Sequence, residues 1–161
     1  MDLADSRERH SAVCEFCAIR KENMNDIEYF DHTADVGFRL VRPAKEDLYR
    51  DAVFGMFDII APTKEYRKTV DYEITVTGKD LEELMVNWLS EFNFYFQVEG
   101  YVPRAINNIT FTSNGLAAAT HGFRVNRSAR NSEIEIKAVT YHMLYVQKTN
   151  HEWKMQVIFD I

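Results

Sequence analysis

The chain has 161 residues, of which 46% are apolar and 27% are charged, and its net charge is -6 at pH 7. This length and composition are typical of one globular domain with its own core. No run approaches the roughly 18 consecutive apolar residues that a membrane span needs, so we expect no membrane association. The acidic balance, with scattered Lys and Arg, disfavours strong direct binding of nucleic acid, because such binding normally uses a basic face.

The N-terminal part is charged and has no helical or strand periodicity. We therefore interpret residues 1–24 as a poorly ordered N-terminal extension and residues 25–161 as the folded domain. The extension lacks the apolar core of a signal peptide, which predicts a cytoplasmic protein. Cys14 and Cys17 lack the further donors of a zinc site and the βαβ context of a redox pair, so we interpret them as free thiols.

A hairpin is predicted at the start of the domain. Ile27–Phe30 reads as a strand, and a polar turn with the sequence Asp-His-Thr-Ala-Asp follows at 31–35. A second strand then runs from Val36 to Val41. Its apolar residues alternate, which places one face of this strand in a core.

Two helices and an intervening strand are predicted next. Pro43 suits the first turn of a helix that ends before Pro62. An alternating strand follows at 70–77. Asp80 and Glu83 form a capping box at the start of the second helix. The buried stripe of this helix has apolar residues at helical spacing: Leu81, Leu84, Met85, Trp88, Leu89, Phe92 and Phe96.

The last third of the chain is rich in predicted strands. The segments 106–112 and 116–125 flank Asn114-Gly115, the strongest short signal for a β-hairpin. A further strand is predicted from Ser132 to Val146, and a last one from Trp153 to Ile161. The order of elements predicts an α+β fold, a single domain with two helices packed on a largely antiparallel β-sheet.

Carboxylates at predicted strand ends are the candidates for chemistry. Asp31 and Asp35 flank the first turn, and Asp160 precedes the terminal carboxylate of Ile161. Carboxylates gathered in one place repel one another, so one of them is protonated or the group binds a cation. Oxygen ligands favour Ca²⁺ or Mg²⁺. The alternative is that Asp31 caps its turn and that Asp160 is merely exposed.

Two further polar residues have simple readings. A lone histidine in a turn, such as His32, is more often a hydrogen-bonding residue than a ligand or a base. Lys137 lies between acidic residues on a predicted strand and most simply forms surface ion pairs with Glu133 and Glu135. No phosphate loop, nucleophile elbow or dinucleotide-binding motif is present.

Three motifs, taken together, resemble the archease family. They are Asp-His-Thr-Ala-Asp at 31–35, Lys-Ala-Val-Thr-Tyr-His at 137–142, and the final Val-Ile-Phe-Asp-Ile at 157–161. The second predicted helix also fits the family's pattern, so the resemblance extends over about residues 26–161. It implies an archease-like fold.

The resemblance also implies a function. Archeases are metal-binding accessory proteins of the RtcB-type RNA ligase, which joins RNA ends that carry a 2′,3′-cyclic or 3′-phosphate to a 5′-hydroxyl in tRNA splicing and RNA repair. They promote guanylylation of the ligase and let it turn over repeatedly. The resemblance therefore implies an activator with an RtcB-type ligase as its protein partner, and not an enzyme with catalytic residues of its own.

The family's site residues map onto positions of this chain. The resemblance implies that Asp35, Asp160 and the backbone carboxylate of Ile161 hold a divalent ion, Ca²⁺ in the first place, with Mg²⁺ or Mn²⁺ as alternatives. It also implicates Lys137. The histidine of the first motif varies in the family, so His32 is implicated only secondarily.

Two other functions use the same residues. One is a stand-alone metal-dependent phosphoesterase, which would turn over without a partner. The other is a chaperone-like binding module in which the metal is structural.

Overall fold

The structure is a computed structural model, and it describes residues 26–32, 34–60, 66–126 and 134–161. Of His32, Tyr66 and Arg67 it describes the backbone only. The predicted extension at 1–24, with Cys14 and Cys17, lies outside the described residues.

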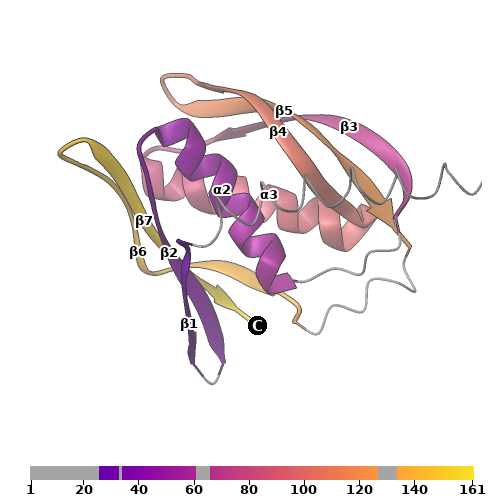
Figure 1. The fold of residues 1–161 in the computed structure, drawn as a ribbon, viewed down its shortest axis with the longest axis horizontal. Helices are drawn as coiled ribbons and strands as arrows, with labels where there is room; N and C mark the ends of the chain where they lie inside the picture. Colours follow the sequence, from indigo (N-terminus) through magenta and orange to yellow (C-terminus); the bar gives the residue numbers. More distant parts are fainter. Residues whose placement is uncertain (1–25, 33, 61–65, 127–133) are drawn as a thin grey trace, which may run out of the picture.

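Two antiparallel sheets and two helices make up the described part of the chain (Figure 1). The four-stranded sheet has the order β1-β2-β7-β6, with β1 (Glu28–His32), β2 (Asp35–Arg42), β7 (Glu152–Asp160) and β6 (Ala138–Thr149). The three-stranded sheet has the order β3-β5-β4, with β3 (Tyr66–Thr77), β5 (Gly115–Val125) and β4 (Tyr101–Phe111). The helices are α2 (Lys45–Ile60) and α3 (Leu81–Glu99).

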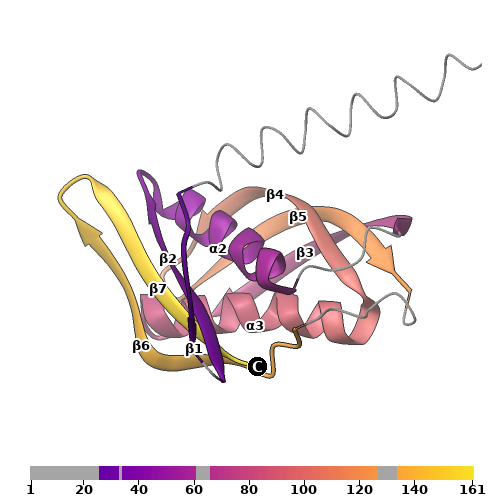
Figure 2. The same ribbon diagram turned by 60° about the horizontal axis from the view of Figure 1, so that its bottom comes forward.

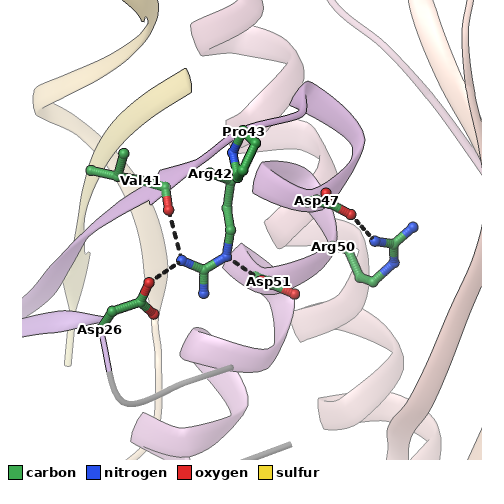
Figure 3. A pocket seen from close by; sticks show the side chains of 7 residues that line it. All are labelled: Asp26, Val41, Arg42, Pro43, Asp47, Arg50 and Asp51. Atoms are coloured by element: carbon green, nitrogen blue, oxygen red, sulfur yellow. Dashed lines mark hydrogen bonds and ion pairs between the residues drawn. The ribbon is translucent and has the colours of Figure 1, made fainter. Parts of the chain in front are cut away.

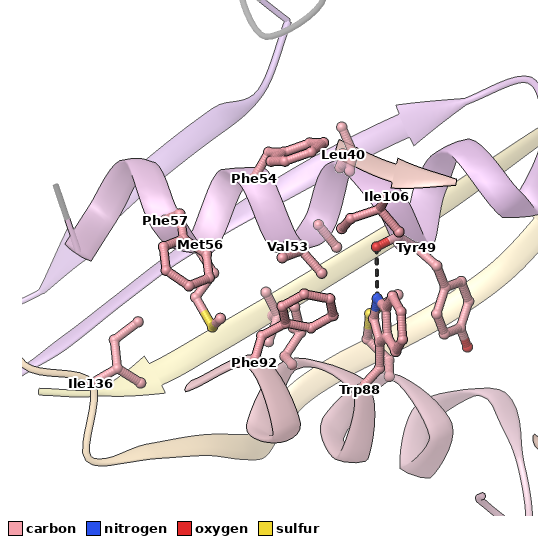
Figure 4. Close-up of a cluster of buried hydrophobic side chains, with 14 of the residues drawn as sticks. Leu40, Tyr49, Val53, Phe54, Met56, Phe57, Trp88, Phe92, Ile106 and Ile136 are labelled. Atoms are coloured by element: carbon pink, nitrogen blue, oxygen red, sulfur yellow. Dashed lines mark hydrogen bonds between the residues drawn. The ribbon is translucent and has the colours of Figure 1, made fainter. Parts of the chain in front are cut away.

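Both helices lie between the two sheets and contact strands of each (Figures 1 and 2). Their facing sides are joined in the core by Trp88 of α3, whose indole Nε1 donates to the Tyr49 carbonyl of α2 at 2.9 Å (Figure 4). Burial of each large side chain of this kind contributes about 1.5–3 kcal/mol. Neither helix combines the length and apolar character that crossing a bilayer requires.

The predicted start of α3 is confirmed, with the return bond of the cap on the residue before Asp80. The Asp80 side chain accepts from the Glu83 amide at 2.8 Å, and the Glu83 side chain accepts from the Lys79 amide at 2.7 Å. At the other end Gly100 adopts φ 71°, and its amide donates to the Phe96 carbonyl at 2.9 Å. A left-handed residue at this position favours glycine, because glycine has no Cβ to clash.

The α+β class and the two helices are confirmed, whereas the strands differ from the prediction. They divide between two sheets, and β6 begins at Ala138 rather than at Ser132. Among the described strands β6 pairs only with β7, whose last residue, Asp160, lies opposite Ala138. Because the partner strand ends there, the pairing does not continue beyond the Lys137 amide, which donates to the Asp160 carbonyl, and the alternation at Ile134 and Ile136 does not form a strand.

Candidate functional site

The strand register brings the first motif and the chain end together. Asp35 of β2 lies directly opposite Asp160 of β7. His32 lies opposite Asp35 on one side, and Ala138 lies opposite Asp160 on the other. These four positions form one row across the four-stranded sheet, which we call the carboxylate row. Directly opposed residues in an antiparallel pair project from the same face, so the two carboxylates share a face.

That face is the outer one, turned away from the helices. The residues that follow and precede the two acids, Val36 and Phe159, are buried in the core. Side chains alternate along a strand, so Asp35 and Asp160 point the other way. Asp35 is half-buried and Asp160 is exposed. Asp31 lies opposite Val36 and thus projects to the opposite side of the hairpin, so the structure does not bring it into the row.

The end of the chain is held on two sides. The Ile161 amide donates to the Ala34 carbonyl at 3.4 Å, and the Ile161 side chain packs partly buried against the core. The Lys137 amide donates to the Asp160 carbonyl at 2.8 Å, and Lys137 Nζ donates to an oxygen of the Ile161 terminal carboxylate at 3.1 Å. Figure 1 marks the terminus beside the β1–β2 hairpin.

The donors at this end of the sheet fit a hard divalent cation. Asp35 and Asp160 are like charges directly opposite one another, an arrangement that destabilises a sheet. Lys137 supplies a single positive charge near these carboxylates and the chain end. Carboxylate oxygens are the donors that Ca²⁺ and Mg²⁺ prefer. Across the described ranges no three His, Cys, Asp or Glu side chains gather closely enough to hold a metal. The predicted set is of another kind, because its third donor is the backbone carboxylate of Ile161.

A hollow of about 210 Å³ adjoins the carboxylate row on the same face. It is lined by Phe30, Asp35, Arg39, His142, Met143, Gln156 and Ile158. Apart from Asp35, and from His142 within the second motif, sequence reasoning did not single out these residues as a group. Of these lining residues, Gln156 is the one that the sequence could have drawn attention to, because it is a polar residue inside an apolar strand.

A bulge of the edge strand β6 forms one wall of this hollow. Tyr141–Leu144 lie opposite the single residue Val157, and Met143 adopts φ 51°. The Gln156 amide, which is only 3% exposed, donates to the Met143 carbonyl at 2.9 Å and accepts from Arg39 Nε at 2.7 Å. A bulge bends an edge strand and redirects its side chains. Here it directs His142 and Met143 toward the hollow that Asp35 also lines.

A larger hollow of about 450 Å³ lies at the other end of β2, at the start of α2 (Figure 3). Its charged groups pair with one another: Arg42 donates to Asp51 and to Asp26, and Arg50 donates to Asp47. Burial raises the pKa of the Asp51 carboxyl, and the hydrogen bond from Arg42 opposes that shift. These ion pairs join β2 to α2. Because the charged groups of this hollow neutralise one another, the hollow offers less charge to a ligand than the carboxylate row.

Comparison with known proteins gives a consistent result over most of the chain. Residues 27–161 match the Archease protein family. The archease of Methanosarcina barkeri is 38% identical over 139 residues, which cover 83% of this chain and 94% of that protein. The solution structure of Methanobacterium thermoautotrophicum protein 1598 superposes with a TM-score of 0.62 at 27% identity, covering 84% of this chain and 98% of that one.

A crystal structure of a Thermotoga maritima archease, described as a "possible chaperone", has a TM-score of 0.59. At 21% identity, with coverage of 82% of this chain and 94% of that one, it shows the shared fold alone.

Proposed function

The chain belongs to the archease family, and on that premise we propose that it is a metal-binding protein cofactor of an RtcB-type RNA ligase. In this proposal it promotes guanylylation of the ligase and its multiple turnover during tRNA splicing and RNA repair in the cytoplasm. It catalyses no reaction of its own.

The observation that carries the proposal is the pairing of Asp35 with Asp160 beside Lys137 and the chain end. Asp35 and Asp160 share the outer sheet face, and Lys137 Nζ contacts the terminal carboxylate one residue beyond Asp160, which supports a site formed by these groups. The net charge of -6 supports a protein partner over a direct grip on RNA, because phosphate binding favours a basic surface.

Each residue of this group has a role in the proposal. Asp35, Asp160 and the Ile161 carboxylate would hold a divalent ion, for which Ca²⁺ is the first candidate. When bound, such an ion supplies positive charge that attracts phosphate oxygens. Lys137 Nζ lies 3.1 Å from the Ile161 oxygen, so it both steadies the chain end and presents an ammonium group to a phosphate of the ligase reaction.

A ligation assay at limiting ligase tests the proposal. Wild-type chain should raise the rates of ligase guanylylation and of RNA joining. Asp35→Ala and Asp160→Ala should each lower this stimulation at least about tenfold, as loss of metal-site partners commonly does. Lys137→Ala should also lower it. Glu73→Ala, which removes an exposed acid from the other sheet, serves as the matched control and should stimulate fully. Full stimulation by both aspartate variants would contradict the proposal.

The same samples separate the two alternatives. A phosphoesterase would consume RNA with a cyclic-phosphate end when no ligase is present. A chaperone-like module would keep its activity after Lys137→Ala and would protect unrelated proteins from aggregation. The description of the Thermotoga maritima relative is the only support for that second alternative, whereas the ligase cofactor uses the residues of all three motifs.

A further inference from the structure

Asn93 interrupts the buried face of α3. Its side chain is 8% exposed, and it lies between the core residues Phe92 and Phe96. Its Nδ2 donates to the Ile136 carbonyl at 2.9 Å, whereas its Oδ1 is buried and has no hydrogen-bond partner among the residues that the structure describes. An unpaired buried amide oxygen costs stability that an apolar side chain would not. Packing therefore does not account for an asparagine at this position.

The hydrogen bond from Asn93 falls on the peptide unit that precedes Lys137. The carbonyl of this unit belongs to Ile136, and it accepts from Asn93 Nδ2 and from Gln97 Nε2, the latter at 2.8 Å. The amide of the same unit belongs to Lys137 and donates to the Asp160 carbonyl at 2.8 Å. Because a peptide unit is planar, contacts at both of its polar groups fix its orientation.

The carbonyl side of this unit is held by side chains of α3 and not by a strand ladder, since β6 begins only at Ala138. The Ile136 side chain is buried in the core between the helices and the four-stranded sheet (Figure 4). The Lys137 side chain, by contrast, is exposed, and its Nζ reaches the Ile161 oxygen at 3.1 Å. The direction in which Lys137 leaves the backbone therefore depends on the peptide unit that α3 holds.

We propose that Asn93, assisted by Gln97, is a positioning residue that sets Lys137 against the terminal carboxylate. The inference rests on the role of Lys137 in the proposed ligase activation. It adds a residue of the helix layer, on the opposite side of the sheet from the carboxylate row, to the groups on which that activation depends.

The first test compares Asn93→Leu with Asn87→Leu. Asn87 is also on α3 and also donates to a carbonyl, that of Thr77 at 2.7 Å, but away from Lys137. Asn93→Leu should keep the wild-type unfolding midpoint within a small margin, because the Ile136 carbonyl retains Gln97 and the unpaired Oδ1 is removed. Asn87→Leu controls for replacing an asparagine of this helix.

In the ligase assay, Asn93→Leu should lower the stimulated rate at saturating protein about tenfold, the effect typical of a residue that orients a functional group. The concentration for half-maximal stimulation should not change. A merely destabilised chain would do the reverse, since a smaller folded fraction raises the concentration needed and leaves the plateau intact. An unchanged plateau would overturn the inference.

The second test needs no ligase. Amide hydrogen exchange, followed by NMR on the free chain, should become severalfold faster at Lys137 in Asn93→Leu. The Val146 amide is the internal control, because it is held by Glu82 of the same helix at 3.0 Å. Unchanged exchange at Lys137 would overturn the inference whatever the ligase does. Failure of the wild-type chain to stimulate the ligase would instead defeat the proposed function, and the exchange rates would still decide whether Asn93 holds this peptide unit.

Discussion

At the scale of single residues, Arg42 carries the most concentrated charge pairing in the described chain. Its side chain is 8% exposed, and it donates to Asp51 of α2, to Asp26 at 2.9 Å and to the Val41 carbonyl at 2.7 Å. Breaking a buried pair by removing one partner is costly, because the other charge remains without compensation. Arg42 is thus more important for joining β2 to α2 than for binding a ligand.

Arg42→Met should therefore lower the free energy of unfolding by about 3–5 kcal/mol at neutral pH. Burial raises the pKa of Asp51 in the folded state, and loss of the guanidinium raises it further. A carboxyl whose folded pKa is raised binds more protons folded than unfolded, so stability recovers as pH falls through that pKa. Urea unfolding at pH 7 and at about pH 5 measures this. An equal loss at both pH values would contradict it, and Asp51→Asn in the same background should restore part of the stability.

At the scale of elements, the predictable parts were those specified by local chemistry. The Asn114-Gly115 turn joins β4 and β5, and the Asp80 cap begins α3, as their sequences predict. Where a segment pairs with a strand that is distant in sequence, the local pattern did not predict where the strand begins. Residues 134–137 alternate like a strand, yet they do not form one, because β7 ends opposite Ala138.

The candidate site shows the same division. Residue chemistry alone left open that Asp31 caps its turn and that Asp160 is merely exposed, and the family resemblance implied that Asp35 and Asp160 act together. Their direct opposition depends on the β2–β7 register, which joins the two ends of the domain and leaves no local signal in either strand. Asn93 and Gln156 were not predicted, because each is one polar residue in an apolar stripe whose partner lies far away in sequence.

The end of β7 offers a direct test of the metal proposal. A short Gly-Ser extension after Ile161 converts the terminal carboxylate into a neutral peptide carbonyl. The fold should persist, since the core contacts of Phe159 and Ile161 do not involve that charge. Calcium affinity, measured by calorimetry, should fall at least about tenfold. The same extension placed at the N-terminus is the control, and equal affinities for the two fusions would contradict a terminal ligand.

At the scale of the whole molecule, the apolar core and the carboxylate row lie in different places. The core lies between the sheets, around Trp88 and Phe92, whereas the carboxylate row lies outside it. Substitution of an exposed acid in the row therefore leaves the buried apolar area intact. Because of this separation, the proposed ligase stimulation and the stability of the fold can be measured independently. Stability responds to titrating groups other than the acids of the row.

Buried tyrosines should make the whole fold sensitive to alkali. Tyr101 is fully buried, its hydroxyl donates to Thr120 Oγ1 at 2.8 Å, and burial raises its pKa to about 12. An unfolded tyrosine ionises near pH 10, so between about pH 10 and 12 the folded chain binds more protons than the unfolded chain. Stability is unaffected below that window and falls as pH rises through it, by up to about 1.4 kcal/mol per pH unit for this group.

Urea unfolding from about pH 8 to about pH 11.5 should show the decline, and Tyr101→Phe should make it shallower, because phenylalanine has no proton to lose. Burial also raises the pKa of Tyr49, so part of the decline should remain in that variant. Tyr141→Phe, which removes a hydroxyl from a residue that is 58% exposed on the bulge of β6, is the matched control. A slope for Tyr101→Phe equal to that of the wild type would show that this buried hydroxyl does not ionise on unfolding.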